Sequence, residues 1–311
     1  MSGGSVSGRA GRLGRVRRLV ALAVVLAVTV LVVPPAALRE APASLVKVES
    51  AQGVDHEPHV LWVLLLGSDA RPGTPVLRGF ADAVQLVGIN TETGAATAIG
   101  IPRDSYVEIP GHGRNKINTS MVIGGPQLMA RSVANMVGIA PDYVFTTGFM
   151  GFIELIKSIG GITVTSQHAF TDPLMPGGFR VGRNELRRGV QALVFTRTRK
   201  SLPRGDFDRS ANQQRALRGI LAKVRGNVDK PGFIERGVLS VVRNLDTNLP
   251  PSELFRLAHA ATRVEPGRFR SCVITGGVGY VGAASVVFPD IAQARSIARR
   301  ARPDATLEGG C

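Results

Sequence analysis

The sequence predicts a mixed α/β fold built around one central sheet. Residues 61–66 are a continuous apolar run, which is typical of a strand buried on both faces. From Val60 onward, short strand patterns alternate with helical ones, and no internal repeat interrupts them. No second linker divides this alternation, so we expect one folded domain over residues 59–311.

The first secondary-structure signal is a hairpin whose strands cover residues 83–89 and 95–101 and flank a turn at residues 90–94. Gly125 and Pro126 open the next helix, and Gly138 closes it. Further helices are predicted over residues 149–161, 189–198, 208–225, 231–244 and 251–263 and from Pro289 on, with strands over residues 162–165, 269–275 and 285–288. Residues 166–183 are rich in Gly and Pro and form a candidate lid.

The N-terminal segment predicts a membrane anchor. Residues 1–18 hold five arginines and no acid, and residues 19–38 hold no charge at all. About 20 residues at roughly 1.5 Å each cover the ~30 Å hydrocarbon layer. We therefore expect a basic cytoplasmic tail (1–18), a transmembrane helix (19–38), a linker (39–58) and a domain outside the cell membrane. The alternative is a signal peptide cleaved near residues 41–43, which also exports the domain.

Export bears on the two cysteines and on the net charge of +15. Cys272 and Cys311 fit no zinc or redox spacing, so in an oxidising compartment we expect a disulfide. The alternative is a buried thiol and a frayed last residue. The basic charge suggests a DNA-binding regulator as a rival hypothesis. An exported domain instead meets anionic wall polymers and lipid headgroups, so no nucleic acid partner is predicted.

Acids and arginines gather where apolar strands end. Asp69, Asp82 and the pair Arg103-Asp104 stand at three such ends. Helical segments downstream carry further polar groups, namely Arg197, Arg199, Arg209 and Gln213. Guanidinium groups match phosphate oxygens two at a time, and Mg²⁺ takes one or two carboxylates with water and phosphate oxygens. The combination predicts a site for a polyanion with a divalent cation. Taken alone, Arg197 and Arg199 are more typical of a solvated helix face. The alternative for Asp82 is a turn cap, and for residues 206–209 a helix N-cap with an ion pair within the helix.

Other motifs indicate less. Residues 277–282 match G-x-G-x-x-G but lead into a strand pattern, so we interpret them as a glycine turn between strands. The five histidines have no metal-ligand spacing, and no serine stands in G-x-S-x-G.

Seven motifs in order give the chain a specific resemblance: LLLGSDAR, an acid opening a hairpin, IPRDSYVEIPG, KIN, GFIELIKSIGGITV, LRRGVQALVFTRTR and GDFDRSANQQ. This order resembles the LytR–CpsA–Psr family over roughly residues 60–224. The resemblance implies a three-layer α/β/α domain held outside the membrane by one N-terminal helix. It also implies transfer of a glycopolymer from an undecaprenyl-pyrophosphate carrier to peptidoglycan.

By position, the resemblance implies Mg²⁺ held by Asp69 and Asp82. Arg103, Asp82 and Asp104 are the catalytic candidates. The pyrophosphate-binding candidates are Arg78, Arg103, Lys116, Arg197, Arg199, Arg209 and Gln213. Two departures from the family pattern stand out. Residues 80–83 lack the arginine that usually precedes the second acid, with Arg78 the nearest substitute, and Asn212 replaces a common arginine.

The implied reaction is phosphoryl transfer, in which a sugar hydroxyl attacks the phosphorus nearest the glycan and undecaprenyl phosphate leaves. The lipid tail requires an apolar tunnel, and the segments at 61–67 and 149–161 are apolar enough to line one. Two alternatives stay open: a protein that binds the lipid pyrophosphate without turnover, and a pyrophosphohydrolase that uses water as the acceptor.

Overall fold

The computed structural model describes residues 41–51, 54, 59–71, 73–233 and 245–311. The expected cytoplasmic tail, transmembrane helix and most of the helix predicted over 231–244 lie outside the described residues. Within the described ranges, no helix combines the length and the apolar character that crossing a bilayer requires.

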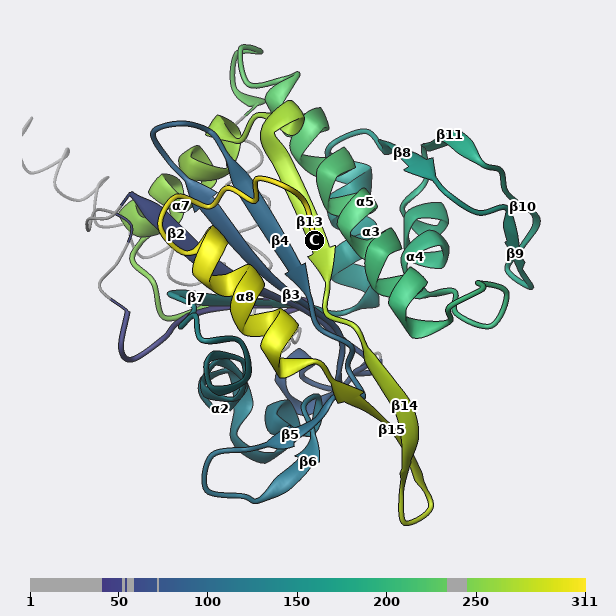
Figure 1. Ribbon diagram of the computed structural model, residues 1–311. Helices are drawn as coiled ribbons and strands as arrows, with labels where there is room; N and C mark the ends of the chain where they lie inside the picture. The colour runs from purple at the N-terminus through teal and green to yellow at the C-terminus, as the bar shows by residue number, and fades with distance from the viewer. Residues whose placement is uncertain (1–40, 52–53, 55–58, 72, 234–244) are drawn as a thin grey trace, which may run out of the picture. The chain divides into compact units, whose positions relative to one another are not determined.

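A seven-stranded sheet forms the centre of the domain (Figure 1). Its strands, in spatial order, are β12 (Leu245–Thr247), β1 (Ala43–Lys47), β7 (Tyr143–Thr147), β2 (Val60–Ser68), β3 (Ala81–Asn90), β4 (Ala96–Gly100) and β13 (Phe269–Val273). The pairs β12–β1, β7–β2 and β4–β13 are parallel, and the other three are antiparallel. The predicted central mixed sheet is therefore confirmed, as is the predicted hairpin of β3 and β4.

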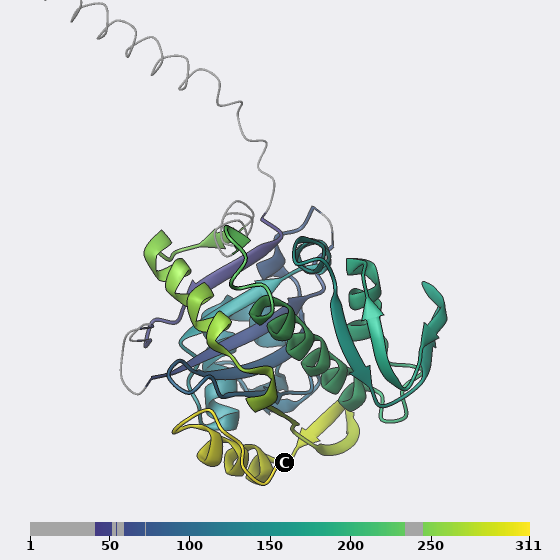
Figure 2. The same cartoon turned by 90° about the horizontal axis from the view of Figure 1, so that it is seen from above.

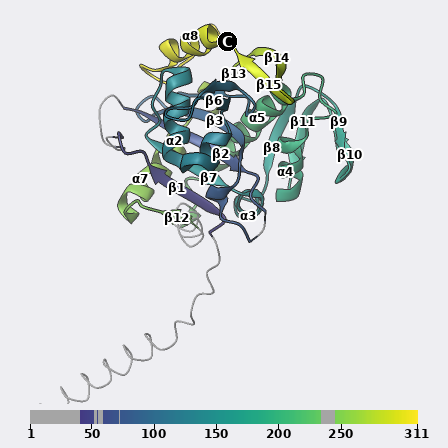
Figure 3. The ribbon, with the colours of Figure 1, turned by 90° about the horizontal axis from the view of Figure 1, so that it is seen from below.

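Strand β2 shows how the sheet supports two helical layers. Trp62, Leu64 and Leu66 belong to a core shared with α2 (Thr119–Val137) and α8 (Ile291–Ala301). The alternate residues Leu61, Val63 and Leu65 face α3 (Phe149–Ser158), α5 (Asp206–Arg225) and α7 (Pro251–Arg263). From above, α5 and α7 lie over one face of the sheet (Figure 2), and from below α2 crosses the other (Figure 3). The fold is thus layered α/β/α.

Helix α2 begins earlier than the sequence predicts. One turn from Thr119 precedes a kink at Gly124 and Gly125, and Pro126 then starts the straight part of the helix. Gly125 has φ 63°, which a residue with a side chain rarely adopts. The predicted C-terminus is confirmed, because Gly138 takes the left-handed conformation and donates its N–H to the Ala134 carbonyl.

Several segments differ from the sequence predictions, and strands β7 and β12 were not predicted. Residues 43–47, which were expected in the linker, form strand β1 inside the sheet. A segment of five residues is too short to show a recognisable strand pattern in the sequence. The candidate lid contains β9 (Phe170–Asp172) and β10 (Met175–Phe179), and β11 (Gly182–Leu186) pairs with β8 (Ile162–Ser166). The prediction of a glycine turn over residues 277–282 is wrong, because residues 276–281 form strand β14, which pairs with β15 (Ala284–Pro289). Half of the residues of β14 are glycines, so the sequence shows no apolar alternation that would indicate a strand.

The remaining elements are short. They are η1 (Val76–Arg78), β5 (Tyr106–Glu108), β6 (Arg114–Lys116), α4 (Gly189–Arg197) and η2 (Pro266–Arg268).

The predicted disulfide is confirmed: Cys272 on β13 bonds Cys311, with 5.6 Å between their Cα atoms. It ties the C-terminal segment that follows α8 back to the sheet across 39 residues. Such a cross-link stabilises the fold by restricting the unfolded chain.

We predict that Cys311→Ser lowers the free energy of unfolding by about 2–4 kcal/mol, because the unfolded chain regains the entropy of that loop. Chemical denaturation of the variant and of the wild type, the latter with and without reductant, measures the difference. Equal stability of all three samples would contradict the prediction.

Candidate functional site

A β-bulge aims Asp82 out of the regular sheet. Gly67 of β2 pairs with Ala83, whereas the next residue, Ser68, pairs with Ala81. Asp82 is therefore the extra residue of the bulge and is left outside the ladder. Bulges of this kind redirect a side chain at the end of a strand pair. The position of Asp82 thus follows from the register of β2 and β3.

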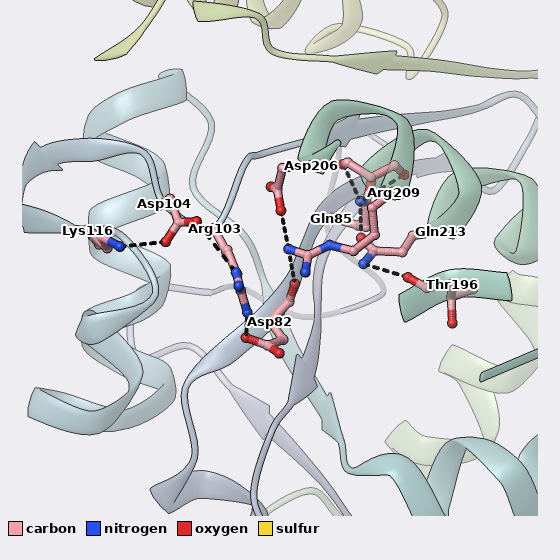
Figure 4. Close-up of polar contacts among 10 residues, drawn as sticks. Asp82, Gln85, Arg103, Asp104, Lys116, Thr196, Asp206, Arg209 and Gln213 are labelled. Carbon is pink, nitrogen blue, oxygen red and sulfur yellow. Dashed lines mark hydrogen bonds and ion pairs between the residues drawn. The ribbon is translucent and has the colours of Figure 1, made fainter. Parts of the chain in front are cut away.

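A row of charged side chains extends from Asp82 (Figure 4). Arg103, in the loop after β4, donates through Nη1 to Asp82 Oδ1. Its Nε lies 3.7 Å from Asp104 Oδ2, and Lys116 Nζ lies 2.9 Å from Asp104 Oδ1. Acids and cations alternate along this row. The structure therefore brings four of the predicted residues together: Asp82, Arg103, Asp104 and Lys116.

The N-terminal turn of α5 supplies the other half of the row. Arg209 pairs with Asp206 at 2.5 Å and donates to the Asp82 carbonyl at 3.3 Å. Arg209 is only 6% exposed and Asp206 7%. A charge buried to this degree requires a partner, so Asp206 holds Arg209 at the site.

A side-chain amide network fixes Gln213 beside Arg209. Gln85 Nε2 donates to Gln213 Oε1 at 3.0 Å and to Ser210 Oγ at 2.9 Å. Gln213 Nε2 in turn donates to the Thr196 carbonyl at 3.3 Å. Gln85, Thr196 and Asp206 were not predicted from the sequence as site residues. The available signals were a lone amide in the apolar strand β3 and an acid in the first turn of α5.

The arginines repel one another. Burial lowers the pKa of Arg209, and the nearby charges of Arg103 and Arg199 lower it further. Burial also acts to lower the pKa of Arg103, but Asp82 and then Asp104 outweigh it, so the net shift is upward. The carboxylates therefore stabilise a cationic cluster that retains an affinity for additional negative charge.

Three predicted arginines lie outside this network. Arg197 and Arg199 are exposed at the end of α4 and just beyond it, and neither forms an ion pair within the described part of the chain. Arg197 lines the cavity described below, and Arg199 is close enough to Arg209 to affect its pKa. Arg78 is exposed at the end of η1, and within the described ranges its side chain forms no ion pair with an acid of the row. Asn212 is buried and accepts a hydrogen bond from Arg215, away from the row.

An apolar cavity of about 520 Å³ opens beside the charged row. Its walls come from β2 and α3, as the sequence predicts, and also from β3, β7, α5 and α7; representative lining residues are Leu65, Val87, Phe145, Phe152, Leu217, Ile220 and Leu257. Asp82, Gln85, Arg197, Arg209 and Gln213 line its polar end. The cavity therefore suits a molecule with an anionic head and a long apolar tail.

Asp69 occupies the end of β2. Its Oδ1 accepts the Phe80 N–H at 2.7 Å, and its own N–H donates to the Phe80 carbonyl at 3.1 Å. Among the described residues, no group of three or more His, Cys, Asp or Glu side chains could hold a metal. Oδ2 of Asp82 takes no hydrogen bond within that part of the chain. A pair of carboxylates is the donor set that Mg²⁺ uses when phosphate and water complete its shell.

Comparison with known proteins identifies the family, because the LytR_cpsA_psr family model matches residues 37–302. The chain belongs to this family. TagU of Bacillus licheniformis, named a polyisoprenyl-teichoic acid–peptidoglycan teichoic acid transferase, is 37% identical over 180 residues, which are 57% of this chain and 56% of TagU. TagU of Bacillus subtilis is 36% identical over 163 residues, 52% of this chain and 51% of the relative.

Solved structures share the fold. TagT bound to LIIa-WTA has a TM-score of 0.64 at 26% identity, over 79% of this chain and 91% of TagT. Bacillus subtilis TagU has a TM-score of 0.59 at 26% identity, over 80% of this chain and 98% of the TagU chain. The sequence matches span just over half the length of the curated relatives. The predicted family is confirmed.

The loop before α5 depends on Asp208. This carboxylate is 1% exposed, accepts the Arg204 N–H at 2.8 Å and pairs with the Arg204 guanidinium. Burial acts to raise the pKa of Asp208, but the bonds from Arg204 outweigh it, and the pKa lies below its ordinary value of 3.8. The stabilisation is therefore present above pH 3.8 and is lost as the pH falls through the lower folded value.

We predict that Asp208→Asn lowers the free energy of unfolding by about 1–3 kcal/mol at pH 7, because the buried network loses its negative charge and one of its two acceptor oxygens. The difference from wild type should shrink as the pH falls below 3.8, where wild-type Asp208 also begins to be neutralised. Urea unfolding at pH 7 and at pH 3 measures both values. A difference independent of pH would show that the carboxylate charge is not what holds the loop.

Proposed function

We propose that this protein transfers a glycopolymer from a polyprenyl-pyrophosphate carrier onto peptidoglycan. One observation carries the proposal: a row of guanidinium groups and carboxylates closes the end of an apolar cavity. An amphipathic donor with a diphosphate between lipid and sugar matches both parts. TagU, a relative, is named as a teichoic acid transferase that acts on peptidoglycan, which supports the same chemistry here.

The charge of the site agrees with a diphosphate diester. Arg103, Lys116 and Arg209 are balanced by Asp82, Asp104 and Asp206. Arg197 and Arg199 then add two positive charges. Asp69 subtracts one charge and a bound Mg²⁺ would add two, so the site keeps a net positive charge toward the two negative charges of the linkage. At about 4 Å and an effective dielectric near 20, each such contact gains on the order of 4 kcal/mol before desolvation.

The mechanism is in-line displacement at the phosphorus that carries the glycan. Arg103 and Arg209 hold the diphosphate oxygens, while Gln213, fixed by Gln85, donates a further hydrogen bond. A sugar hydroxyl of peptidoglycan forms the new P–O bond and releases its proton to the solvent, while the bond between that phosphorus and the bridging oxygen breaks. Polyprenyl phosphate leaves with the negative charge. Because the transition state is loose, positioning and charge stabilisation supply most of the rate.

Asp69 and Asp82 would hold Mg²⁺ at this site. When bound, the ion would offset negative charge on the leaving phosphate. Asp82 also orients Arg103, and Asp104 orients both Arg103 and Lys116, so these acids position the cations that face the diphosphate.

The location follows from the substrate. We propose that residues 19–38 anchor the chain as a single span of the cell membrane, with residues 1–18 in the cytoplasm and the folded domain outside. Carrier lipid, glycopolymer and peptidoglycan meet there, and nucleic acid does not.

The decisive test of the function is transfer in vitro from a polyprenyl-pyrophosphate-linked glycopolymer to purified peptidoglycan. We predict that Arg103→Ala lowers the rate by about 10²- to 10³-fold, because a donor to the diphosphate is lost. Arg299→Ala, an exposed arginine on the distant helix α8, is the matched control. A variant at position 103 that turns over like wild type would remove Arg103 from the site. Release of free glycopolymer phosphate in place of the ligated product would indicate a hydrolase.

Chelation tests the metal. EDTA should stop transfer and added Mg²⁺ should restore it in wild type. In Asp69→Asn the response to Mg²⁺ should be lost or shifted to much higher concentration, because one of two carboxylate ligands is gone. Mg²⁺ titration of the initial rate measures this. An unchanged Mg²⁺ dependence would exclude Asp69 as a ligand.

Filling the cavity tests the lipid position. In Ala258→Trp, an indole enters the cavity lining of α7. If the indole displaces one isoprene unit of the tail from the cavity, about 3 kcal/mol of favourable apolar burial is lost. The affinity for a polyprenyl pyrophosphate should then fall on the order of 100-fold. Ser252→Trp places the same side chain on the exposed side of α7. Calorimetric titration compares them, and equal affinity in both variants would refute this route for the tail.

A further inference from the structure

The hairpin of β14 and β15 presents aromatic side chains that the proposed reaction does not yet use. It projects from the domain beside β5 and β6 (Figure 1). Phe288 is 43% exposed and Tyr280 is 73% exposed. Large apolar side chains left in water on a projecting element are typical of a binding surface.

The hairpin is joined directly to the charged row. The Val287 N–H donates to the carbonyl of Asp104 at 2.9 Å, and Ser105 pairs with Val287 in an isolated parallel bridge. Asp104 is the acid that pairs with Lys116 and contacts Arg103. Phe288 therefore lies one residue beyond a backbone contact with the site.

Phe288, Tyr106 and Arg114 form a continuous strip. The Phe288 and Tyr106 rings meet edge to face with centroids 6.2 Å apart, and the Arg114 guanidinium lies 5.3 Å from the Tyr106 ring centroid. Gly279 allows this arrangement, because a Cβ there would come within 2.9 Å of the Phe288 ring. The Tyr106 backbone pairs with Lys116, so the strip continues the charged row.

We propose that Tyr106, Phe288 and Arg114 form a subsite for the sugar rings of the acceptor glycan. The C–H bonds on the face of a pyranose are weakly positive and pack against the negative face of an aromatic ring. Arg114 adds donors for hydroxyl and acetamide oxygens. This subsite rests on the proposed function, since only the transfer reaction supplies an acceptor.

The order of the groups along the row indicates that the strip of Tyr106, Phe288 and Arg114 faces the acceptor glycan and not the donor glycan. Arg209 and Gln213 lie on one side of Arg103, and Asp104 with Lys116 lies on the other (Figure 4). The lipid cavity opens on the Arg209 side. In an in-line displacement, the nucleophile approaches opposite the leaving group, which here is the lipid phosphate. The acceptor hydroxyl therefore arrives from the Lys116 side, where the strip lies.

The test uses two ligands and a matched control on the same hairpin. Soluble glycan chains released from peptidoglycan and a polyprenyl pyrophosphate are titrated separately into the full chain. Phe288→Ala should weaken glycan binding roughly 3- to 10-fold and leave pyrophosphate binding unchanged. Tyr280→Ala is the control, because strand alternation puts Tyr280 on the opposite face from Phe288. Phe288→Tyr keeps the ring and should bind like wild type. Phe288→Leu replaces the alanine variant if that variant does not fold.

Each outcome decides the proposal. Equal losses in Phe288→Ala and Tyr280→Ala, no loss in either, or no glycan binding by wild type would overturn the subsite, while the donor site could still stand. A Phe288 variant that loses affinity for lipid vesicles or for free donor glycopolymer, but not for the acceptor glycan, would also overturn it. If the glycan binds through Phe288 but no transfer occurs with any donor, the subsite stands and the proposed function fails.

Discussion

The ion pair between Arg103 and Asp82 is the interaction on which the rest of the site depends. A bulge in β3 takes Asp82 out of the ladder, and the loop after β4 brings Arg103 to meet it. From this pair, contacts extend through Asp104 to Lys116 and through the Asp82 carbonyl to Arg209. Buried charges are costly unless each has a partner, so the acids keep the cations in place before any ligand binds. Under the proposed function, a bound diphosphate would add to this network without having to assemble it.

The sheet separates two kinds of interior. One face packs against α2 and α8 in a closed apolar core. The other face is incompletely filled by α3, α5 and α7, and the resulting cavity ends at the charged row. A protein interior normally packs without voids of this size, so the unfilled space is itself evidence of a ligand. Apolar segments of similar composition therefore form a closed core on one side of the sheet and line a cavity on the other.

Sequence patterns predicted the features that depend on local chemistry. The runs that form β2, β3 and β4 are long and apolar, and Pro251 at the first position of α7 and Gly138 after α2 mark helix ends. Acids and arginines at strand ends pointed to Asp82 and Arg103, and an arginine in a helical segment pointed to Arg209; the structure brings these three side chains together. Features that depend on long-range register were not predictable. Gln85 matters because α5 packs over β3, β1 is too short to signal a strand, and β14 is recognisable only through its pairing with β15. Arg78 was selected by proximity in sequence, and the structure leaves its side chain exposed at the end of η1.

A crystal structure of the full chain with a polyprenyl pyrophosphate is the most direct test of the central claim. We expect diphosphate oxygens within hydrogen-bond distance of Arg103 and Arg209, with the prenyl chain between β2, α5 and α7. A diphosphate bound away from these two arginines, or a tail lying outside the cavity, would contradict it.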